Sequence, residues 1–333
     1  MTKKIAINGM GRIGRAAAKI LLYRDDFELV AVNDLLPADV MAYLLTHDSV
    51  YGRFPKKITA GHDYIEADGR IIQKYSEKEP QNLPWEKNNI DLVLECTGMF
   101  TNRQSLEKHI QAGAKHVILS APCKDEDIPT VVYGANTVEI SDQIISCGSC
   151  TTNCITPIME VIDRRLGIQK AIMTTVHAYT ATQSLVDTAA QKWTRGRAAA
   201  VNFVPTSTGA ALATTKVLPE LEGLFEGVAV RGPVPIGSIA DIVICTIKTT
   251  SIDEINSILS EEANGERYNN VLGVSKMPLV SSDIIRDPRA SIVDLNMTRV
   301  VGGDLVKIMS WYDNEWGYSN QMIRTARQLL DTD

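Results

Sequence analysis

Short apolar runs alternate with amphipathic stretches over the first 150 residues of the chain. Residues 4–8 form an apolar run of strand length, and residues 12–23 then repeat apolar side chains at helical spacing. This alternation predicts parallel strands joined by helical crossovers, hence an α/β fold with a doubly wound sheet. The expected elements are strands at residues 4–8, 29–32, 92–96, 116–120 and 144–146, and helices at 12–23 and 38–45.

The pattern changes after residue 150. A helix is expected from there to about residue 166, and the strand-like segments that follow are longer and separated by fewer helices. This predicts an α+β domain with a mostly antiparallel sheet. Residues 180–203 are polar and lack periodicity, and a loop of that length inside a compact domain is usually functional. The expected strands are residues 171–179, 228–231, 239–248, 291–295 and 305–312.

Two domains are expected, because 333 residues are many for a single core. We place the first domain at residues 1–149 and the second at residues 150–314. The last residues, 315–333, carry apolar side chains on one helical face. They are therefore expected to form a helix that packs back on the first domain.

Charge and composition narrow the class of protein. The net charge is −6, and no run of Lys and Arg exceeds two or three residues, which argues against a dedicated nucleic-acid surface. The sequence shows no signal-peptide core and no apolar stretch of about 18 residues. We therefore expect a soluble, cytoplasmic protein without a membrane partner, whose six cysteines are free thiols.

A glycine motif lies between the first strand and the first helix. Gly9, Gly11 and Gly14 form G-x-G-x-x-G, in which the missing side chains permit a tight turn and let a pyrophosphate approach the helix N-terminus. Asp34 ends the next strand, twenty residues after Gly14, where a carboxylate would bind the adenosine ribose hydroxyls. The motif predicts a dinucleotide site. The alternative is a glycine turn that only packs a helix.

Cys150 follows the strand at residues 144–146 and opens the next helix. A thiol in the first turn of a helix is expected to have a lowered pKa, because the dipole and the free N–H groups stabilise the thiolate. The hydroxyls of Ser149 and Thr151 flank it and are suited to binding an anionic substrate group. Cys150 is therefore the candidate nucleophile.

Two other interpretations of the cysteines remain open. Cys147, Cys150 and Cys154 form C-x2-C-x3-C, a spacing seen in metal and iron–sulfur sites, although no fourth ligand is obvious. We expect no metal. The other interpretation is simple packing, which suits Cys96, Cys245 and Cys154.

His177 lies near the end of the strand at residues 171–179. By itself such a histidine is usually an interior residue with a satisfied partner. Next to Cys150 it is a candidate base, since a thiol that oxidises an aldehyde needs a group to take the hydroxyl proton as hydride leaves.

The motifs taken together resemble those of the phosphorylating glyceraldehyde-3-phosphate dehydrogenases, over essentially the whole chain. The similar segments include residues 5–15 (IAINGMGRIGR), 47–52 (HDSVYG), 149–154 (SCTTNC), 205–211 (PTSTGAA) and 311–318 (WYDNEWGY).

The resemblance implies that Cys150 is the nucleophile and His177 its activator and base. It also implies two anion sites, and arginine forks with hydroxyls and N–H groups are chemically suited to holding two phosphates near one carbon. Without the resemblance, Arg231 would be a surface charge at a strand end, and Thr208 with Gly209 an ordinary helix N-cap. The implied residues are Ser149, Thr151, Thr208 and Gly209 for inorganic phosphate, and Thr180, Arg197 and Arg231 for the substrate C3-phosphate and the attacking phosphate.

The cofactor implied is NAD. Asn314 is expected to orient the nicotinamide carboxamide, and Lys78 stands where the family often has arginine near the adenine. The implied cofactor contacts are Gly9, Gly11, Arg12, Ile13, Gly14, Asp34, Lys78, Ser120 and Asn314.

Two departures from the family pattern have consequences. Cys147-Gly148 replaces Asn-Ala, which puts a second thiol three residues from Cys150; the replacement is either neutral or makes the site sensitive to oxidation. Thr188-Ala189 replaces a Leu-Pro that is common in members strict for NAD. Asp34 repels a 2′-phosphate, so we expect use of NAD with some tolerance of NADP.

The expected reaction is oxidation of glyceraldehyde 3-phosphate with NAD and inorganic phosphate to 1,3-bisphosphoglycerate, by a homotetramer. Erythrose-4-phosphate dehydrogenase is the alternative within the same class. From another class, the alternative is a binding protein without turnover that uses the dinucleotide groove.

Overall fold

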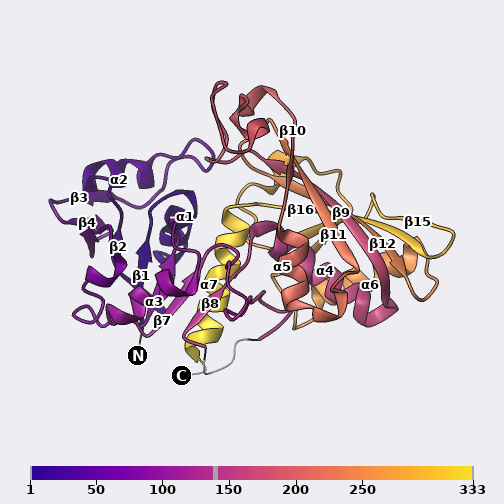
Figure 1. The fold of residues 1–333 in the computed structure, drawn as a ribbon, viewed down its shortest axis with the longest axis horizontal. Coiled ribbons are helices and arrows are strands. Elements are labelled where there is room, and N and C mark those ends of the chain that lie inside the picture. The colour runs from indigo at the N-terminus through magenta and orange to yellow at the C-terminus, as the bar shows by residue number, and fades with distance from the viewer. Residues whose placement is uncertain (1, 138–141, 332–333) are drawn as a thin grey trace. The chain divides into compact units, whose positions relative to one another are not determined.

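The computed structural model describes residues 2–137 and 142–331. The chain forms two compact units (Figure 1). Unit 1 comprises residues 1–131, 137–148 and 322–333, and unit 2 comprises residues 132–136 and 149–321. Two segments differ from the expected boundaries. Residues 132–136 group with unit 2, and the C-terminal helix α7 (Trp316–Asp331) is divided, with only its part from residue 322 belonging to unit 1.

Unit 1 is built on an eight-stranded sheet in the order β3-β4-β5-β2-β1-β6-β7-β8. The strands from β5 to β8 in this order pair in parallel, as the strand–helix alternation predicted. The elements are β1 (Lys3–Asn8), α1 (Arg12–Leu21), β2 (Phe27–Asn33), α2 (Ala38–Thr46), β3 (Ile58–Ala60), β4 (Tyr64–Ala67), β5 (Arg70–Tyr75), β6 (Leu92–Glu95), α3 (Arg103–Gln111), β7 (His116–Leu119) and β8 (Ile144–Ser146).

The antiparallel edge of this sheet was not predicted. Strands β3, β4 and β5 form a meander in which each strand is antiparallel to the next. Asp68 and Gly69 connect β4 to β5 with φ angles of 50° and 81°. An Asp-Gly pair with positive φ at both positions is a favoured two-residue hairpin turn. This pair was the signal in the sequence that could have revealed the meander.

Buried apolar side chains cover both faces of the central strands. In β1, Ile5, Ala6 and Ile7 are 1% exposed or less, and Val93 and Leu94 of the neighbouring β6 are fully buried. Consecutive residues of a strand point to opposite faces, so helices must cover both sides of the sheet. This burial on both faces explains the continuous apolar runs in the sequence. Because the strands run parallel, their carboxyl ends lie at one edge of the sheet.

Unit 2 contains a second eight-stranded sheet, in the order β10-β11-β9-β12-β16-β14-β13, with β15 paired to β16. Most pairs are antiparallel, but β9 with β11 and β13 with β14 are parallel. The predicted fold class is therefore confirmed, although helix α6 was not expected and α5 was foreseen only as the alternative interpretation of Thr208 and Gly209. The elements are α4 (Cys150–Leu166), β9 (Ile168–Ala178), β10 (Val204–Ser207), α5 (Ala210–Val217), β11 (Phe225–Gly232), β12 (Ser238–Thr246), α6 (Ile252–Asn264), β13 (Leu272–Ser275), β14 (Ser291–Asp294), β15 (Arg299–Val301) and β16 (Leu305–Tyr312).

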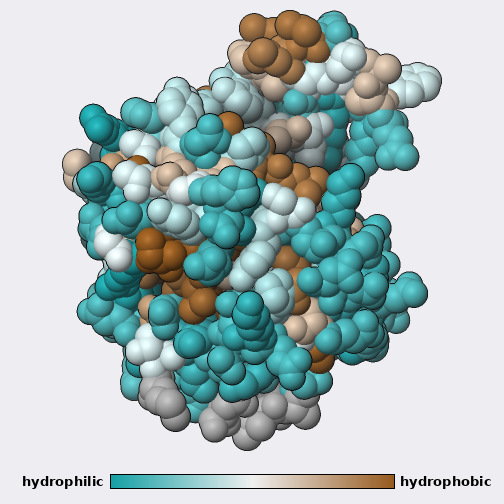
Figure 2. Space-filling view, turned by 90° about the vertical axis from the view of Figure 1, so that its left-hand side faces the viewer, coloured by the Kyte–Doolittle hydropathy of each residue, from teal (hydrophilic) through white to brown (hydrophobic). Residues whose placement is uncertain are grey.

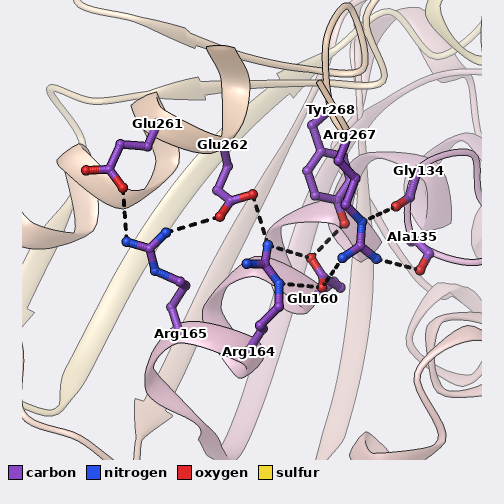
Figure 3. Close-up of polar contacts among 9 residues, drawn as sticks. All are labelled: Gly134, Ala135, Glu160, Arg164, Arg165, Glu261, Glu262, Arg267 and Tyr268. Carbon is purple, nitrogen blue, oxygen red and sulfur yellow. Dashed lines mark hydrogen bonds and ion pairs between the residues drawn. The ribbon is translucent and has the colours of Figure 1, made fainter. Parts of the chain in front are cut away.

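A charged network fixes helix α4 to its surroundings (Figure 3). Glu160 is 8% exposed, and its carboxylate accepts hydrogen bonds from Arg164, Arg267 and Tyr268, each at 2.8 Å. Arg267 also donates to two backbone carbonyls of the segment 132–136, at 2.6 and 2.9 Å. Each ion therefore has a partner, which is the condition for burying charge at low cost. The network holds the segment 132–136 on α4, the helix that begins at Cys150.

The molecular surface that Figure 2 shows is mostly hydrophilic, with hydrophobic residues gathered in a few places. Among the helices that the structure describes, none has the length and apolar character needed to cross a membrane.

Candidate active site

The loop between β1 and α1 needs glycine at two positions for different reasons. Gly9 has a φ of +94°, and a Cβ there would lie 2.7 Å from the backbone nitrogen of Thr97. A Cβ on Gly14 would lie 2.0 Å from the carbonyl oxygen of Gly9, far inside contact distance. At Gly11, by contrast, no protein atom lies within 4 Å of the added Cβ. Gly11 therefore faces open space at the helix N-terminus, where a pyrophosphate fits against backbone N–H groups.

A cavity of about 620 Å³ opens beside this loop. The carboxylate of Asp34 lies in its wall and accepts hydrogen bonds from the N–H groups of Met10 at 2.7 Å and Leu36 at 3.0 Å. Each carboxylate oxygen keeps a further lone pair for a ribose hydroxyl. The size, the glycine cradle and the fixed acid fit a dinucleotide. The lining residues are Asn8, Gly9, Gly11, Asn33, Asp34, Leu35, Glu77, Lys78, Glu79, Cys96, Thr97, Met99 and Phe100.

Four of the expected cofactor residues in unit 1 are not in this lining: Arg12, Ile13, Gly14 and Ser120. The guanidinium of Arg12 is paired with Asp48 at 2.9 Å and lies over the ring of Tyr51. Ile13 is half-buried in the first turn of α1, and Ser120 directly follows β7. Of the expected cofactor residues, Gly9, Gly11, Asp34 and Lys78 thus line the cavity, whereas the Arg12 side chain is paired with Asp48.

In unit 2, Cys150 is the first residue of α4, as predicted. Ser149 caps the helix: its Oγ accepts the N–H of Thr152 at 3.1 Å, while its own backbone N–H contacts the Thr152 hydroxyl at 3.4 Å. This reciprocal cap fixes the turn that presents Cys150. The sulfur of Cys150 lies 3.3 Å from Nε2 of His177, which projects from the end of β9. The sequence-predicted thiol and imidazole are therefore in direct contact.

On the far side of the ring, Nδ1 of His177 has two polar neighbours. It lies 2.7 Å from the carbonyl oxygen of Ala178 and 2.9 Å from Nη1 of Arg231, which also donates to that oxygen at 3.0 Å. The carbonyl can only accept and the guanidinium can only donate, so the first contact favours a hydrogen on Nδ1 and the second favours a lone pair there. With the hydrogen on Nδ1, Nε2 presents its lone pair to the Cys150 thiol and can take its proton.

The pKa of Cys150 shifts in the direction opposite to the expectation. Burial raises the pKa of the Cys150 thiol above its ordinary value, and the Arg231 charge and the hydrogen bonds of Thr151 only partly oppose it. Burial, together with the nearby Arg231 charge, lowers the pKa of His177 to about 3. Loss of solvent thus acts against the charged form of both groups, opposite to the effect expected from the helix start.

Arg231 is positioned to hold an anion beside this pair. It is paired in register with His177, because β11 and β9 run parallel at that point. Its Nη1 atom donates to Ala178, but its buried Nε–H has no hydrogen-bond partner among the described residues. A buried unpaired donor on a guanidinium favours an anionic ligand. This observation supports the predicted role of Arg231 in binding phosphate.

Two arginines of the long loop, Arg195 and Arg197, differ from the expectation. The expected residue, Arg197, forms an ion pair with Asp187 at 2.7 Å, and both side chains are more than half exposed. Arg195 is close enough to the centre that its charge lowers the pKa values of both His177 and Arg231. Its Nε donates to the hydroxyl of Thr206 at 3.1 Å. The sequence analysis missed Arg195, because two arginines separated by one residue cannot be told apart without the path of the loop.

The predicted hydroxyls and the carboxamide of unit 2 are held by internal partners. Gly209 is the N-cap of α5, and the preceding Thr208 hydroxyl accepts the N–H of Ala210 at 3.2 Å. Asn314 is 5% exposed, and its Oδ1 accepts the hydroxyl hydrogen of Ser238 at 2.9 Å. The amide nitrogen of Asn314 is thereby oriented as a donor. The remaining contacts are Thr151 to the Tyr312 hydroxyl at 3.0 Å and Thr180 to the Thr182 hydroxyl at 2.9 Å.

The cysteine spacing does not form a metal centre in the part of the chain that the structure describes, where no group of three or more potential ligands converges. All six cysteines are free thiols. Cys154 is buried near the hydroxyl of Ser291, and Cys147 is buried in unit 1, where loss of solvent raises its pKa to about 12. These two thiols are therefore interior residues rather than nucleophiles.

Comparison with known proteins agrees with this geometry. A family model described as the NAD binding domain of glyceraldehyde 3-phosphate dehydrogenase matches residues 3–103, and the model of its C-terminal domain matches residues 149–314. The glyceraldehyde-3-phosphate dehydrogenase of Pseudomonas aeruginosa is 46% identical, over 99% of this chain and 98% of its own. The enzymes of Thermotoga maritima and Zymomonas mobilis are 45% and 43% identical, over at least 98% of both chains. The glycine cradle, the thiol–imidazole pair and these full-length relatives place the chain in the glyceraldehyde-3-phosphate dehydrogenase family.

Proposed function

We propose that the chain oxidises D-glyceraldehyde 3-phosphate with NAD and inorganic phosphate to 1,3-bisphosphoglycerate, with Cys150 as nucleophile and His177 as base. The contact of 3.3 Å between the Cys150 sulfur and Nε2 of His177 is the observation that supports these two roles. A neutral imidazole whose Nδ1–H is donated to Ala178 has a bare Nε2 that can accept a proton and later return it.

In the first step the thiol proton moves to Nε2 of His177 while the sulfur of Cys150 adds to the aldehyde carbon. His177 then returns this proton to the former aldehyde oxygen, which gives a thiohemiacetal hydroxyl and a neutral imidazole. The nicotinamide ring of bound NAD supplies a hydride acceptor. As hydride leaves the carbon, His177 takes the hydroxyl proton, and a thioester on Cys150 remains. Burial and the nearby Arg231 charge lower the pKa of His177, which favours the neutral imidazole that can act as a base.

The second half of the reaction requires a phosphate oxygen to attack the thioester carbonyl. Carbon–sulfur cleavage then releases an acyl phosphate and returns Cys150 to its starting state. We propose that the unpaired Nε–H of Arg231 and the nearby guanidinium of Arg195 hold the phosphate groups, because guanidinium–phosphate hydrogen bonds are charge-assisted. The hydroxyls of Ser149, Thr151, Thr180 and Thr208 and the N–H of Gly209 complete the proposed sites.

Initial rates test this proposal directly. NADH formation should require glyceraldehyde 3-phosphate and should fall to a single enzyme-equivalent when phosphate is omitted, because the thioester then accumulates on Cys150. Erythrose 4-phosphate under the same conditions is the matched control substrate. A faster phosphate-dependent rate with erythrose 4-phosphate would contradict the proposed substrate, and steady turnover without phosphate would contradict the acyl-transfer step.

NAD is the cofactor of the family's binding domain, and we propose in addition that NADP is tolerated. The carboxylate of Asp34 in the cavity wall disfavours a 2′-phosphate, whereas Thr188-Ala189 are small residues in the long loop. The measurement is kcat/KM with each cofactor at equal aldehyde concentration. An efficiency with NADP more than about a thousandfold below that with NAD, roughly 4 kcal/mol, would exclude tolerance.

We also propose a homotetramer in the cytoplasm. Five large apolar side chains of the long loop and its end are between 70% and 89% exposed: Leu185, Val186, Trp193, Val201 and Phe203. Exposed apolar groups of this size mark interaction surfaces. Light scattering coupled to gel filtration should give four times the chain mass of 36.5 kDa, and a monomer mass would contradict the proposal. Cell fractionation tests the location.

A further inference from the structure

A buried carboxylate lies behind the wall of the dinucleotide cavity. Glu95, the last residue of β6, is fully buried, and its side chain does not line the cavity. Its Oε1 accepts the N–H of Thr97 at 2.7 Å as well as the Thr97 hydroxyl hydrogen. Its Oε2 accepts from the Asn8 amide at 2.5 Å and contacts Nε2 of His109 at 3.1 Å. A buried acid with so many convergent donors requires an explanation, because burying a carboxylate is costly.

The direction of each hydrogen bond around Glu95 is fixed by Trp85. The indole N–H of Trp85 can only donate, and it lies 3.0 Å from Nδ1 of His109. Nδ1 must therefore accept, so the hydrogen of His109 is on Nε2 and is donated to Glu95. Trp85 and His109 are both fully buried, which leaves the ring no alternative partner from solvent. All the groups around Glu95 are donors, and the carboxylate is the acceptor they share.

The network continues from Glu95 into the cavity wall. Because the amide nitrogen of Asn8 donates to Glu95, its Oδ1 must face the other way, and it accepts from Asn33 at 2.7 Å. Asn33 in turn binds both backbone groups of Glu77, donating to the carbonyl at 2.9 Å and accepting the N–H at 2.8 Å. Asn8, Asn33, Glu77 and Thr97 all line the cavity. Residues distant in sequence thus form one hydrogen-bonded unit.

We propose that Glu95 is a positioning residue for the cofactor. Its buried negative charge orients the amides of Asn8 and Asn33, and through them holds the backbone of Glu77 and the adjoining Lys78 at the cavity wall. If the carboxylate is replaced by an amide, one acceptor becomes a donor that faces donors, so both asparagine amides lose their fixed orientation. The affinity for NAD therefore depends on the charge at position 95. This inference rests on the proposed binding of NAD in this cavity.

The test compares Glu95→Gln with the native full-length protein. The dissociation constant of NAD, measured by calorimetry, should rise by at least about tenfold in the variant. The exchange of the Glu77 backbone N–H with deuterium, measured without NAD, should become faster, because that N–H loses its fixed acceptor on Asn33. Glu107→Gln is the matched control. It removes a carboxylate from α3 that is 45% exposed and paired with Arg103 at 3.7 Å, and it should change neither quantity.

Asn33→Ser is the second variant, and it decides the question if Glu95→Gln does not fold. It leaves Glu95 and His109 intact but breaks the link to Glu77, so it should give the same two changes. The inference would be overturned if a folded variant kept the native exchange rate at Glu77 and an NAD affinity within about twofold of native. If Glu95 only stabilised the fold, its replacement would lower the unfolding temperature without changing these two quantities. If the native protein does not bind NAD, the proposed function fails, while the exchange of Glu77 still decides whether Glu95 positions the wall.

Discussion

The two glycines Gly11 and Gly14 should separate the stability of the protein from its affinity for NAD. In Gly14→Ala the new Cβ would lie 2.0 Å from the Gly9 carbonyl oxygen, and backbone lies on both sides of this contact. The loop must therefore move by more than an ångström. In Gly11→Ala the new Cβ meets no protein atom within 4 Å, and the residue already has a φ of −67°, which alanine adopts freely.

The structure gives the size of each effect. Overpacking of this kind costs about 1–3 kcal/mol, so Gly14→Ala should lower the unfolding temperature by about 2–4 °C for each kcal/mol and also weaken NAD binding. Gly11→Ala loses a favourable N-cap, which costs about 1 kcal/mol at most, and gains a similar amount from the reduced entropy of the unfolded chain. Its unfolding temperature should stay nearly constant. Its methyl group nevertheless fills the space at the helix N-terminus, so NAD affinity should fall by at least about tenfold, or 1.4 kcal/mol.

Calorimetric unfolding without NAD and titration with NAD measure the two quantities on the same samples. The native protein and both alanine variants suffice, since each variant is the control for the other. If Gly11→Ala binds NAD as tightly as the native protein, the open space at Gly11 is not the pyrophosphate site. If Gly14→Ala unfolds at the native temperature, the Gly9 carbonyl oxygen does not approach position 14 as closely as the structure indicates.

Three further outcomes are expected. Cys150→Ser should reduce phosphate-dependent NADH formation by at least about a thousandfold, because a hydroxyl is a far weaker nucleophile than a thiol, whereas Cys245→Ser should keep most of the rate. Burial raises the pKa of Asp48, but two backbone N–H groups and a guanidinium lower it further, to about 2. This carboxylate therefore contributes about 2 kcal/mol of stability above pH 4, which is lost as the pH falls from about 4 to about 2, and Asp48→Asn should remove that part of the acid dependence in unfolding experiments. Arg195→Ala should raise the KM for phosphate or aldehyde by about tenfold and Arg197→Ala by less than about twofold, and the reverse order in steady-state kinetics would contradict the placement of these guanidiniums.

The sequence predicted correctly those features that depend on a few adjacent residues. The glycine spacing, the acid at Asp34 and the start of α4 at Cys150 each depend on a few adjacent residues, and the structure has all of them where they were expected. The meander β3–β5 was missed because its strands are three to six residues long, too short for a clear alternation. Helix α6 was missed for a different reason, because long strand-like runs dominate the pattern of that region, and α5 was foreseen only through the alternative role of Thr208 and Gly209 as a helix N-cap.

The direction of the pKa shift at Cys150 needed the structure. The position of Cys150 at a helix start indicated a lowered pKa, but burial acts in the opposite direction and is stronger here. Burial of a side chain depends on every segment that packs over it, and no local pattern in the sequence reports it. The same holds for Arg195 and Arg197, whose roles depend on which of them the loop turns towards Asp187.

The sequence by itself determined the class of fold, the dinucleotide loop and the candidate thiol and imidazole, because each depends on residue type and short spacing along the chain. Only the tertiary structure decided that Cys150 and His177 are in contact, that Arg231 approaches them, and that the buried acid Glu95 is joined to a chain of amides. These contacts join residues that are distant in sequence, such as Cys150 and His177, 27 positions apart, and Asn8 and Glu95, 87 positions apart. Such contacts exist only when folding has brought the strands together and has excluded water from between them.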